Sequence, residues 1–348
     1  MIKEAKDPFS DYDTSHSLEL QEIKKQGMNN LDVRVSNSYF NKLAIAEFSS
    51  AFFSLVGLFL SILLYERRHI ESLKEVQVRR DEAEYELYKS MTQFFSMSCT
   101  FLLIFSLFTR YSLWLDWCKS VNKFTQFDTL ITTGMWQSMV FEMTINLIAP
   151  YSFFDGLKYV EQVTAYEVEI EYEINDILLF FCFARVYIAY RFSFFLTEFM
   201  NPRTQRVCAM NGCHADAMFA LKSLMKSRPF TVLLSSLFIS LFIFSYLLRL
   251  FESPLSEASG QDFTSYNNAM WNMVITLTSA GYGDFYPKTF WGRVVGVSIC
   301  FWGVIITSLV VATVTNMLTF TTSEEKSYEM LVRIGKKQEM KKKAVDVL

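Results

Sequence analysis

The chain has 348 residues, of which 51% are hydrophobic and 20% charged, and its formal net charge is -3. A soluble chain of this size seldom carries so much apolar surface, and the near-balanced charge gives no support for nucleic-acid binding. Apolar runs of about 20 residues, long enough to cross a bilayer core of about 30 Å, recur along the sequence. We therefore expect an all-α membrane protein with six transmembrane helices, surrounded by a lipid bilayer.

The N-terminal half predicts a tail followed by four spans. Residues 1–42 are polar and of mixed charge, which favours a cytosolic segment that is either mobile or a short surface helix. Residues 43–200 then form a predicted four-helix membrane domain. Its candidate spans are residues 43–65, 91–113, 133–154 and 174–200.

The third and fourth spans of this domain contain polar or charged residues that indicate how these helices pack. Glu142 and Asn146 in the third span are costly to expose to lipid, so we expect them to face other helices, and Pro150 should kink or end that helix. The fourth span contains Arg185 and Arg191, which are six positions apart. A voltage sensor carries arginines at every third position, because several charges must cross the field. We therefore interpret both arginines as structural or hydrogen-bonding residues.

The charged loops predict how the chain is oriented. The acidic loop 155–173 contrasts with the basic linker 201–228 and the basic tail 321–348. Basic loops favour the cytosolic side, so both termini, the linker and the tail are expected in the cytosol and the acidic loop outside. The loop after the first span is also rich in Lys and Arg. Its acidic residues match them in number, so we give the pore geometry more weight than this loop.

A pore domain is predicted for residues 229–320. Two spans, residues 229–251 and 290–318, flank a short helix from Tyr266 to about Leu277 that is too short to cross the membrane. We expect this short helix to enter the membrane, stop at a filter, and direct its C-terminal dipole toward a cation.

The segment between the short helix and the last span carries a motif with a mechanism. Alternating glycines let the backbone adopt conformations that residues with a Cβ resist, so successive carbonyls can turn toward one axis. A ring of such carbonyls replaces the water around a potassium ion. One chain supplies a quarter of the ring, so function requires a tetramer, which we expect to be homomeric. The predicted selectivity filter, with potassium at its first four residues, is Ser279, Ala280, Gly281, Tyr282, Gly283 and Asp284.

The helices around the filter contain further candidate residues. Gly303 in the last span permits a bend or allows close packing against a neighbouring helix, and the sequence supports both equally. Thr307 either faces water in the cavity or bonds back to its own helix. An apolar ring at Val311 and Val314 would close the pore by dewetting. The candidates on the pore helix are Trp271, Thr276 and Thr278.

The pore sequence resembles that of one known family, the small- and intermediate-conductance calcium-activated potassium channels. The likeness extends over about residues 43–330 and includes Arg249 and Glu252. Ala280 departs from it, because the family has a larger aliphatic residue at that position. The matching pattern is Ala269-Met270-Trp271, Ile275-Thr276, Ser279, Gly281-Tyr282-Gly283-Asp284, Pro287, Thr289, Gly292 and Leu309-Val310-Val311-Ala312.

The resemblance implies a tetrameric potassium channel that is weakly voltage-dependent and is opened by calcium through constitutively associated calmodulin. The four-helix domain would then resemble a voltage sensor, and residues 321–348 would contain the start of a calmodulin-binding region. Apolar positions among lysines from Met330 to Leu348 are compatible with a calmodulin target, a membrane-surface helix or a plain amphipathic helix. The chain contains no EF-hand loop, so calcium would act only indirectly.

Two other functions stay open beside this one. The first is a non-conducting, channel-derived subunit with an assembly role in a larger membrane complex, and the second is a calcium-independent potassium leak channel. An enzyme is not expected, because the sequence contains no arrangement of nucleophiles and no phosphate-binding loop. Cys208, Cys213 and His214 lie close in sequence, but no second ligand pair follows at zinc-finger spacing, which disfavours a metal site.

Overall fold

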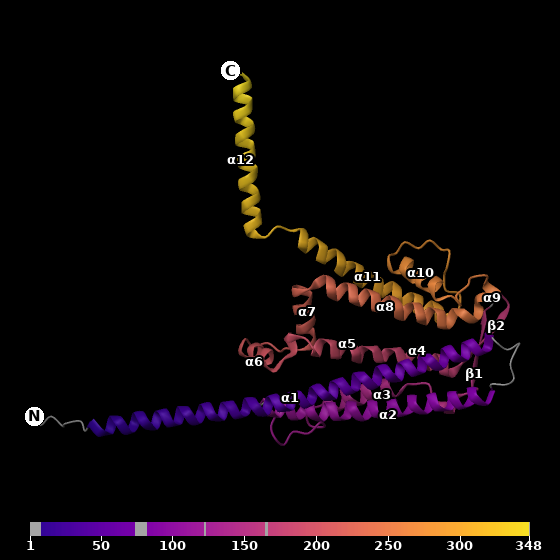
Figure 1. Ribbon diagram of the computed structural model, residues 1–348, viewed down its shortest axis with the longest axis horizontal. Coiled ribbons are helices and arrows are strands. Elements are labelled where there is room, and N and C mark those ends of the chain that lie inside the picture. Colours follow the sequence, from indigo (N-terminus) through magenta and orange to yellow (C-terminus); the bar gives the residue numbers. More distant parts are fainter. Residues whose placement is uncertain (1–7, 74–81, 122, 164–165, 348) are drawn as a thin grey trace, which may run out of the picture. The chain divides into compact units, whose positions relative to one another are not determined.

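The chain divides into two compact units in its computed structural model (Figure 1). Five of the described helical segments are long and apolar enough to cross a membrane, which agrees with the expected helical membrane protein. The first unit comprises Met1–Gln162 and Glu169–Ser223, and the second comprises Val163–Val168 and Leu224–Leu348. The residues that the structure describes are 8–73, 82–121, 123–163 and 166–347.

Two long helices form most of the first unit (Figure 1). Helix α1 (Pro8–Leu73) contains the predicted first span and α2 (Glu82–Ser120) contains the second. They pack along each other, and buried side chains such as Ala51 and Leu103 belong to their shared core. The tail predicted for residues 1–42 differs from the structure, because α1 already begins at Pro8 and continues into the span without a break.

The predicted third span is much shorter as a helix than expected. Helix α3 (Met135–Leu147) has 13 residues, which is too few to cross a bilayer core. Pro150 explains its early end, since proline lacks an N–H and holds the preceding residue in an extended conformation. A 3-10 turn (Ser152–Phe154) follows. At this position the structure departs from the prediction of six full-length spans.

The acidic loop forms a β-hairpin that the sequence analysis missed. Strand β1 (Lys158–Val163) pairs with β2 (Val168–Glu173). Ile170 and Tyr172 of β2 are buried while Glu169 and Glu171 are exposed, which is the alternation of a strand with one covered face. The hairpin adds a small sheet to a chain that was expected to be all-α.

The fourth candidate span is a helix with a short interruption, and two linker helices follow it. Helix α4 (Ile174–Cys182) and α5 (Val186–Phe195) are joined by a 3-10 turn (Phe183–Arg185) and together form the span. The linker consists of α6 (Pro202–Met210) and α7 (Ala217–Ser227).

Three helices form the packed part of the second unit. Helix α8 (Pro229–Glu252), α10 (Tyr266–Leu277) and α11 (Phe290–Leu318) contact one another pairwise. Their bounds closely match the predicted fifth span, pore helix and last span. The short helix α9 (Ser256–Ser259) lies on the connection between α8 and α10, and α12 (Thr322–Val347) follows α11.

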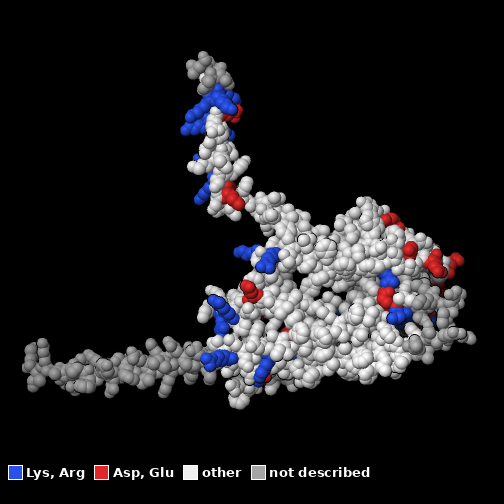
Figure 2. Space-filling model, in the orientation of Figure 1, with Lys and Arg blue, Asp and Glu red and all other residues white. Residues whose placement is uncertain are grey.

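Local signals explain why these bounds were predictable. Pro229 favours the first turn of α8, because its missing N–H has no partner in a helix at that position. Thr289 caps α11 by accepting a hydrogen bond from the Gly292 N–H at 2.9 Å. Figure 2 shows the sides of α8 and α11 largely free of charged side chains, while Lys and Arg side chains gather on α12.

Candidate ion-conduction site

The backbone of the predicted filter alternates in handedness. The φ angle is positive at Ser279 (58°), Gly281 (59°) and Gly283 (77°), while Ala280 and Tyr282 between them keep ordinary values. Such alternation turns successive carbonyls to one side of the chain and successive N–H groups to the other. A left-handed conformation costs roughly 1–2 kcal/mol for a residue with a Cβ. The fold therefore holds Ser279 in a costly conformation that suits a row of carbonyl ligands.

The N–H groups at the start of the filter bond to the end of the pore helix. The Ser279 N–H donates to the Thr276 carbonyl at 3.0 Å, and the N–H groups of Ala280 and Gly281 donate to the Ile275 carbonyl at 2.9 and 3.3 Å. These bonds occupy the donors on one side of the chain. The filter residues are exposed in the single chain, which leaves their carbonyls available to an ion.

The three candidate residues of the pore helix have different partners. The hydroxyls of Thr276 and Thr278 donate hydrogen bonds to backbone carbonyls one turn earlier in α10. Trp271 instead donates its indole N–H to the Asp284 carboxylate at 2.7 Å, and its ring stacks on Tyr282 with centroids 6.1 Å apart. The hydrogen bond from Trp271 holds the pKa of Asp284 below its usual value. The structure thus brings Trp271 together with two residues of the predicted filter.

A buried carboxylate fixes the segment that returns from the filter to α11. Glu252, at the end of α8, is 1% exposed and accepts hydrogen bonds of 2.9 Å from the N–H groups of Lys288 and Thr289 and from the Thr289 hydroxyl. A side chain at Gly292 would collide with this carboxylate, so glycine is sterically required there. The sequence did not predict the contact between Glu252 and Gly292, because a contact between such distant positions leaves no local signal.

Gly303 packs the last span against the pore helix. A Cβ at this position would lie 2.9 Å from the Leu277 carbonyl oxygen and 3.2 Å from the Leu277 Cα, and both are backbone atoms. Helix α11 is continuous through Gly303. The close packing that the sequence left open is therefore present in this structure, and a hinge at Gly303 stays a prediction.

The other residues of the predicted gate follow Gly303 on α11. Thr307 donates its hydroxyl to the Gly303 carbonyl at 2.8 Å, so it bonds back to its own helix. Val311 and Val314 are 64% and 39% exposed in the single chain. Their apolar surface is thus uncovered in the single chain, and a gate at these valines stays a prediction.

Comparisons with known proteins agree with this pore geometry. Residues 228–320, which contain the filter and the helices on both sides, match the family model for ion channels, Ion_trans_2. The chain is 26% identical over 174 residues to the small conductance calcium-activated potassium channel-like protein 3 of Caenorhabditis elegans, and the match covers 50% of this chain and 25% of that relative. The chain is similar to small-conductance calcium-activated potassium channels.

Two further relatives extend the comparison. The small conductance calcium-activated potassium channel protein of Drosophila melanogaster is 29% identical over 167 residues, which cover 48% of this chain and 18% of the relative. A voltage-gated potassium channel regulatory subunit of Homo sapiens is 39% identical over 83 residues, which cover 24% of this chain and 19% of the relative. The matches thus span a quarter or less of each relative's length. They confirm the resemblance to potassium channels and the expectation that the chain is not an enzyme.

The first unit of this channel-like chain contains an ionic cluster of two arginines and two glutamates. Arg110 of α2 and Arg191 of α5 each pair with both Glu47 of α1 and Glu142 of α3. Glu47 is only 3% exposed and Glu142 only 9%. Because four helices each contribute one residue, the pairs hold together segments that are far apart in sequence.

Neutral groups add further hydrogen bonds to the cluster. The hydroxyls of Tyr111 and Tyr187 donate to the two Glu142 carboxylate oxygens at 2.6 and 2.7 Å, and the Asn146 amide donates to the Tyr187 oxygen at 3.0 Å. Glu142 and Asn146 therefore contact other helices, as expected. The sequence analysis missed Arg110, although a lone arginine inside an apolar span is a signal for a buried partner.

Arg185 is buried separately in the same unit. It is 1% exposed, and its Nη2 donates to the Asn146 carbonyl at 2.8 Å and to the Thr100 hydroxyl at 3.2 Å. Gly57 leaves room for the guanidinium, because a Cβ there would lie 3.1 Å from Nη1. The contacts of Arg185 and Arg191 fit the structural and hydrogen-bonding interpretation of both arginines.

Proposed function

We propose that this chain is the pore-forming subunit of a potassium-selective channel. The observation that carries the proposal is the alternating handedness at Ser279, Gly281 and Gly283, with N–H groups turned to the pore helix. The carbonyls of residues 279–282 and the Ser279 hydroxyl would replace the water around the permeating potassium ion. Four identical chains around one axis would complete the ring, because a single chain supplies one side of it.

The first unit would give such a channel only weak voltage dependence. Arg110 and Arg191 are paired with two buried carboxylates, and moving either arginine across the membrane field would leave a buried charge without its partner. Both termini would lie in the cytosol, and the pore would close by dewetting at Val311 and Val314 on the cytosolic side of the filter.

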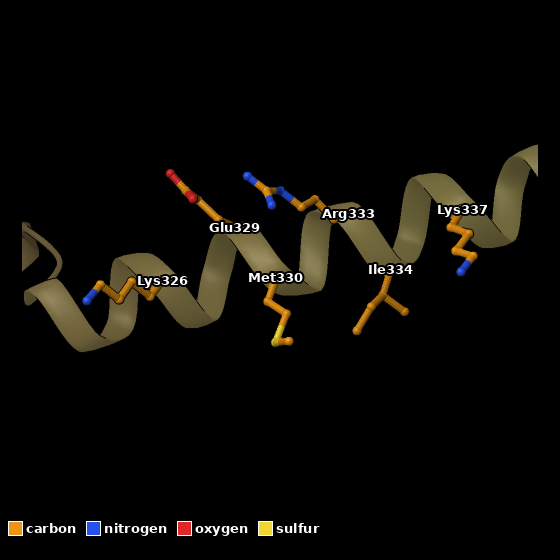
Figure 3. A pocket seen from close by; sticks show the side chains of 6 residues that line it. All are labelled: Lys326, Glu329, Met330, Arg333, Ile334 and Lys337. Carbon is orange, nitrogen blue, oxygen red and sulfur yellow. The ribbon is translucent and has the colours of Figure 1, made fainter.

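Calcium would open the pore through calmodulin bound to α12. The names of two relatives state calcium activation for those proteins, and α12 offers a surface that suits a calmodulin groove. Met330 and Ile334 point to one side of this helix, with Lys326 and Lys337 at either end (Figure 3). Met330 is 67% and Ile334 49% exposed. Calmodulin takes amphipathic helices with apolar anchors spaced in this way.

A non-conducting subunit within a larger membrane complex is the second candidate function. The relative that is 39% identical over its matched segment is named a regulatory subunit of a potassium channel. Ala280 also favours a non-conducting subunit, because its side chain is smaller than the aliphatic residue of the resembled family and therefore changes the packing behind the filter. A calcium-independent leak channel is the third, and it would keep the pore without the calmodulin response.

Recordings from the full-length chain in planar bilayers distinguish these functions. We expect a reversal potential close to that of potassium in mixed potassium and sodium, and a current that rises when calcium and calmodulin are added together. Equal permeability to the two cations would overturn potassium selectivity. No current under any condition would favour the non-conducting subunit, and a current that ignores calcium would favour the leak channel.

Two glycine variants control this experiment. Gly281→Ala forces a Cβ into a left-handed position of the filter and should abolish or disorder potassium selectivity. Gly156→Ala is the matched control: Gly156 is also left-handed with open space around it but lies in the acidic loop, so this variant should conduct like the unmodified chain.

A further inference from the structure

The linker brings two cysteines together at the end of α6. The Gly212 N–H donates to the Ala209 carbonyl at 3.1 Å, and the Cys213 N–H donates to the Cys208 carbonyl at 2.9 Å. Gly212 between these bonds is left-handed, with a φ of 71°. The two bonds and the left-handed glycine form a Schellman motif, which places its first and sixth residues in contact. In this chain those two residues are Cys208 and Cys213.

The two thiols differ in their surroundings. The Cys213 thiol lies 3.3 Å from the Cys208 carbonyl oxygen, and Cys213 is exposed whereas Cys208 is buried. Burial raises the pKa of Cys208, and the adjacent Cys213 thiol raises it further. Cys213 is therefore the thiol that a dissolved reagent reaches first, while Cys208 is placed directly beside it as the second reactant.

We propose that Cys208 and Cys213 form a dithiol that reacts with hydroperoxides and closes to an intramolecular disulfide. The Cys213 thiolate attacks one oxygen of hydrogen peroxide, an S–O bond forms, the O–O bond breaks, and one water leaves after protonation. Cys213 is then a sulfenic acid. The Cys208 sulfur attacks the sulfenic sulfur, the S–S bond forms, the S–O bond breaks, and the hydroxide takes the Cys208 proton as a second water. The two thiols lose two electrons, and the peroxide is reduced by them.

The position of the pair suggests what the disulfide does. The ring would fix the turn between α6 and α7, which is the start of the connection to α8. The linker is expected on the cytosolic side, where disulfides are usually transient and serve redox sensing. The other four cysteines, Cys99, Cys118, Cys182 and Cys300, lie within candidate membrane spans instead.

Mass spectrometry of the full-length chain tests the proposal directly. The purified protein is exposed to hydrogen peroxide, alkylated and digested with trypsin, which cleaves after Arg206 and Lys222. The resulting peptide, residues 207–222, contains Cys208 and Cys213 and no other cysteine. We expect it to lose two hydrogens in mass and to resist alkylation, and a reductant should reverse both changes.

The same peptide contains Met210, which is 86% exposed and reports whether peroxide reached this surface. Two free thiols beside an oxidised Met210 would overturn the proposal. Over-oxidation of Cys213 to a sulfinic acid while Cys208 stays free would also overturn it, because adjacent thiols should close the disulfide first.

A glycine substitution tests whether the turn itself brings the thiols together. Gly212→Ala adds a Cβ that meets nothing within 4 Å, so it acts only through the left-handed backbone. We expect it to slow disulfide formation about fivefold to thirtyfold, because a Cβ disfavours that backbone conformation. Gly260→Ala is the matched control, since Gly260 is also left-handed with open space around it and lies far along the chain. Equal rates in the two variants would contradict a role for the motif.

Discussion

The ionic cluster and the filter handle polar groups inside a membrane in opposite ways. Each glutamate of the cluster is paired with two arginines of the same chain, so its charges are already compensated. At the start of the filter the N–H groups of Ser279, Ala280 and Gly281 are bonded to the pore helix, while these residues are themselves exposed. Leaving a buried charge or carbonyl unpaired costs several kcal/mol in order of magnitude. The charges of the cluster are therefore compensated within one chain, whereas in the proposed channel the filter carbonyls would be compensated by an ion and by further copies.

This difference predicts two kinds of sensitivity to substitution. A change in the cluster should lower the stability of the single chain, because its partners are left with unpaired charges. A change at the filter should alter ion passage while most of the fold persists. The following predictions test that division, beginning with the largest expected effect.

Glu142→Ala should produce the largest loss of stability. The change removes one of the two carboxylate partners of Arg110 and Arg191, and it also removes the acceptor of the Tyr111 and Tyr187 hydroxyls. Removing one partner of a buried ion pair costs about 3–5 kcal/mol. Thermal or denaturant unfolding of the detergent-solubilised chain measures the loss, and a shift no larger than that of an exposed ion-pair variant would contradict the cluster's structural role.

Gly303→Ala should destabilise the chain by about 1–3 kcal/mol, because the added methyl overlaps backbone atoms of Leu277 that cannot move aside. The control is Gly335→Ala, because a Cβ at this position would meet nothing within 4 Å. This control should stabilise α12 by about 0.5–1 kcal/mol. Unfolding curves of both variants distinguish close packing of Gly303 against the pore helix from a hinge in α11 at this residue. A gain in stability for Gly303→Ala similar to that of the control would favour a hinge.

Trp271→Phe should change the pH response of the filter mouth. In the unmodified chain the indole N–H lowers the pKa of Asp284, so the carboxylate keeps its charge, and its contribution to stability, until the pH falls through that lowered value. Without the indole N–H the pKa of Asp284 rises, so the charge of this carboxylate and its contribution to stability should both be lost at a higher pH. Single-channel conductance against external pH, or a carboxyl NMR titration, measures this shift.

The control for that titration is Asp262, whose pKa is lowered by a hydrogen bond from the Thr264 hydroxyl. Its titration should not move in Trp271→Phe. An unchanged titration of Asp284 would show that the indole bond does not set its charge.

Glu171→Gln should have the smallest effect. Lys158 and Glu171 pair across the hairpin at 2.6 Å, but their side chains are 54% and 55% exposed. Water screens such pairs, so the expected loss is below about 1 kcal/mol. The same unfolding measurement as for Glu142→Ala applies, and similar losses for the two variants would remove the distinction between buried and exposed ion pairs in this chain.

The parts of the fold that were predictable depend on neighbours in sequence. The bounds of α8, α10 and α11 follow from local caps and apolar length, as Pro229 and Thr289 illustrate. The hairpin was missed because its acidic residues were read as loop charge, although Val168–Glu173 alternates between apolar and acidic residues. The third span was predicted too long because the sequence stays apolar beyond Leu147. The helix nevertheless ends at Leu147, because Pro150 follows closely.

The backbone of the candidate site was easier to predict from the sequence than its contacts, and the roles of its residues stay predictions. The unusual backbone conformation of the filter motif was predicted from its glycines, because glycine adopts positive φ angles readily. The left-handed Ser279 has no such signal, since serine rarely adopts this conformation. Arg110 and the Glu252 contacts also escaped prediction, because they depend on which helices become neighbours in three dimensions.

The contact between Glu252 and Gly292 has a consequence for how related chains can vary. Because the carboxylate occupies the space where a side chain at 292 would extend, the two positions cannot change independently. Alanine at 292 should be tolerated only together with a shorter residue at 252, and that shorter residue would leave the N–H groups of Lys288 and Thr289 without an acceptor. Substitutions at these two positions, 40 residues apart, should therefore occur together among homologues.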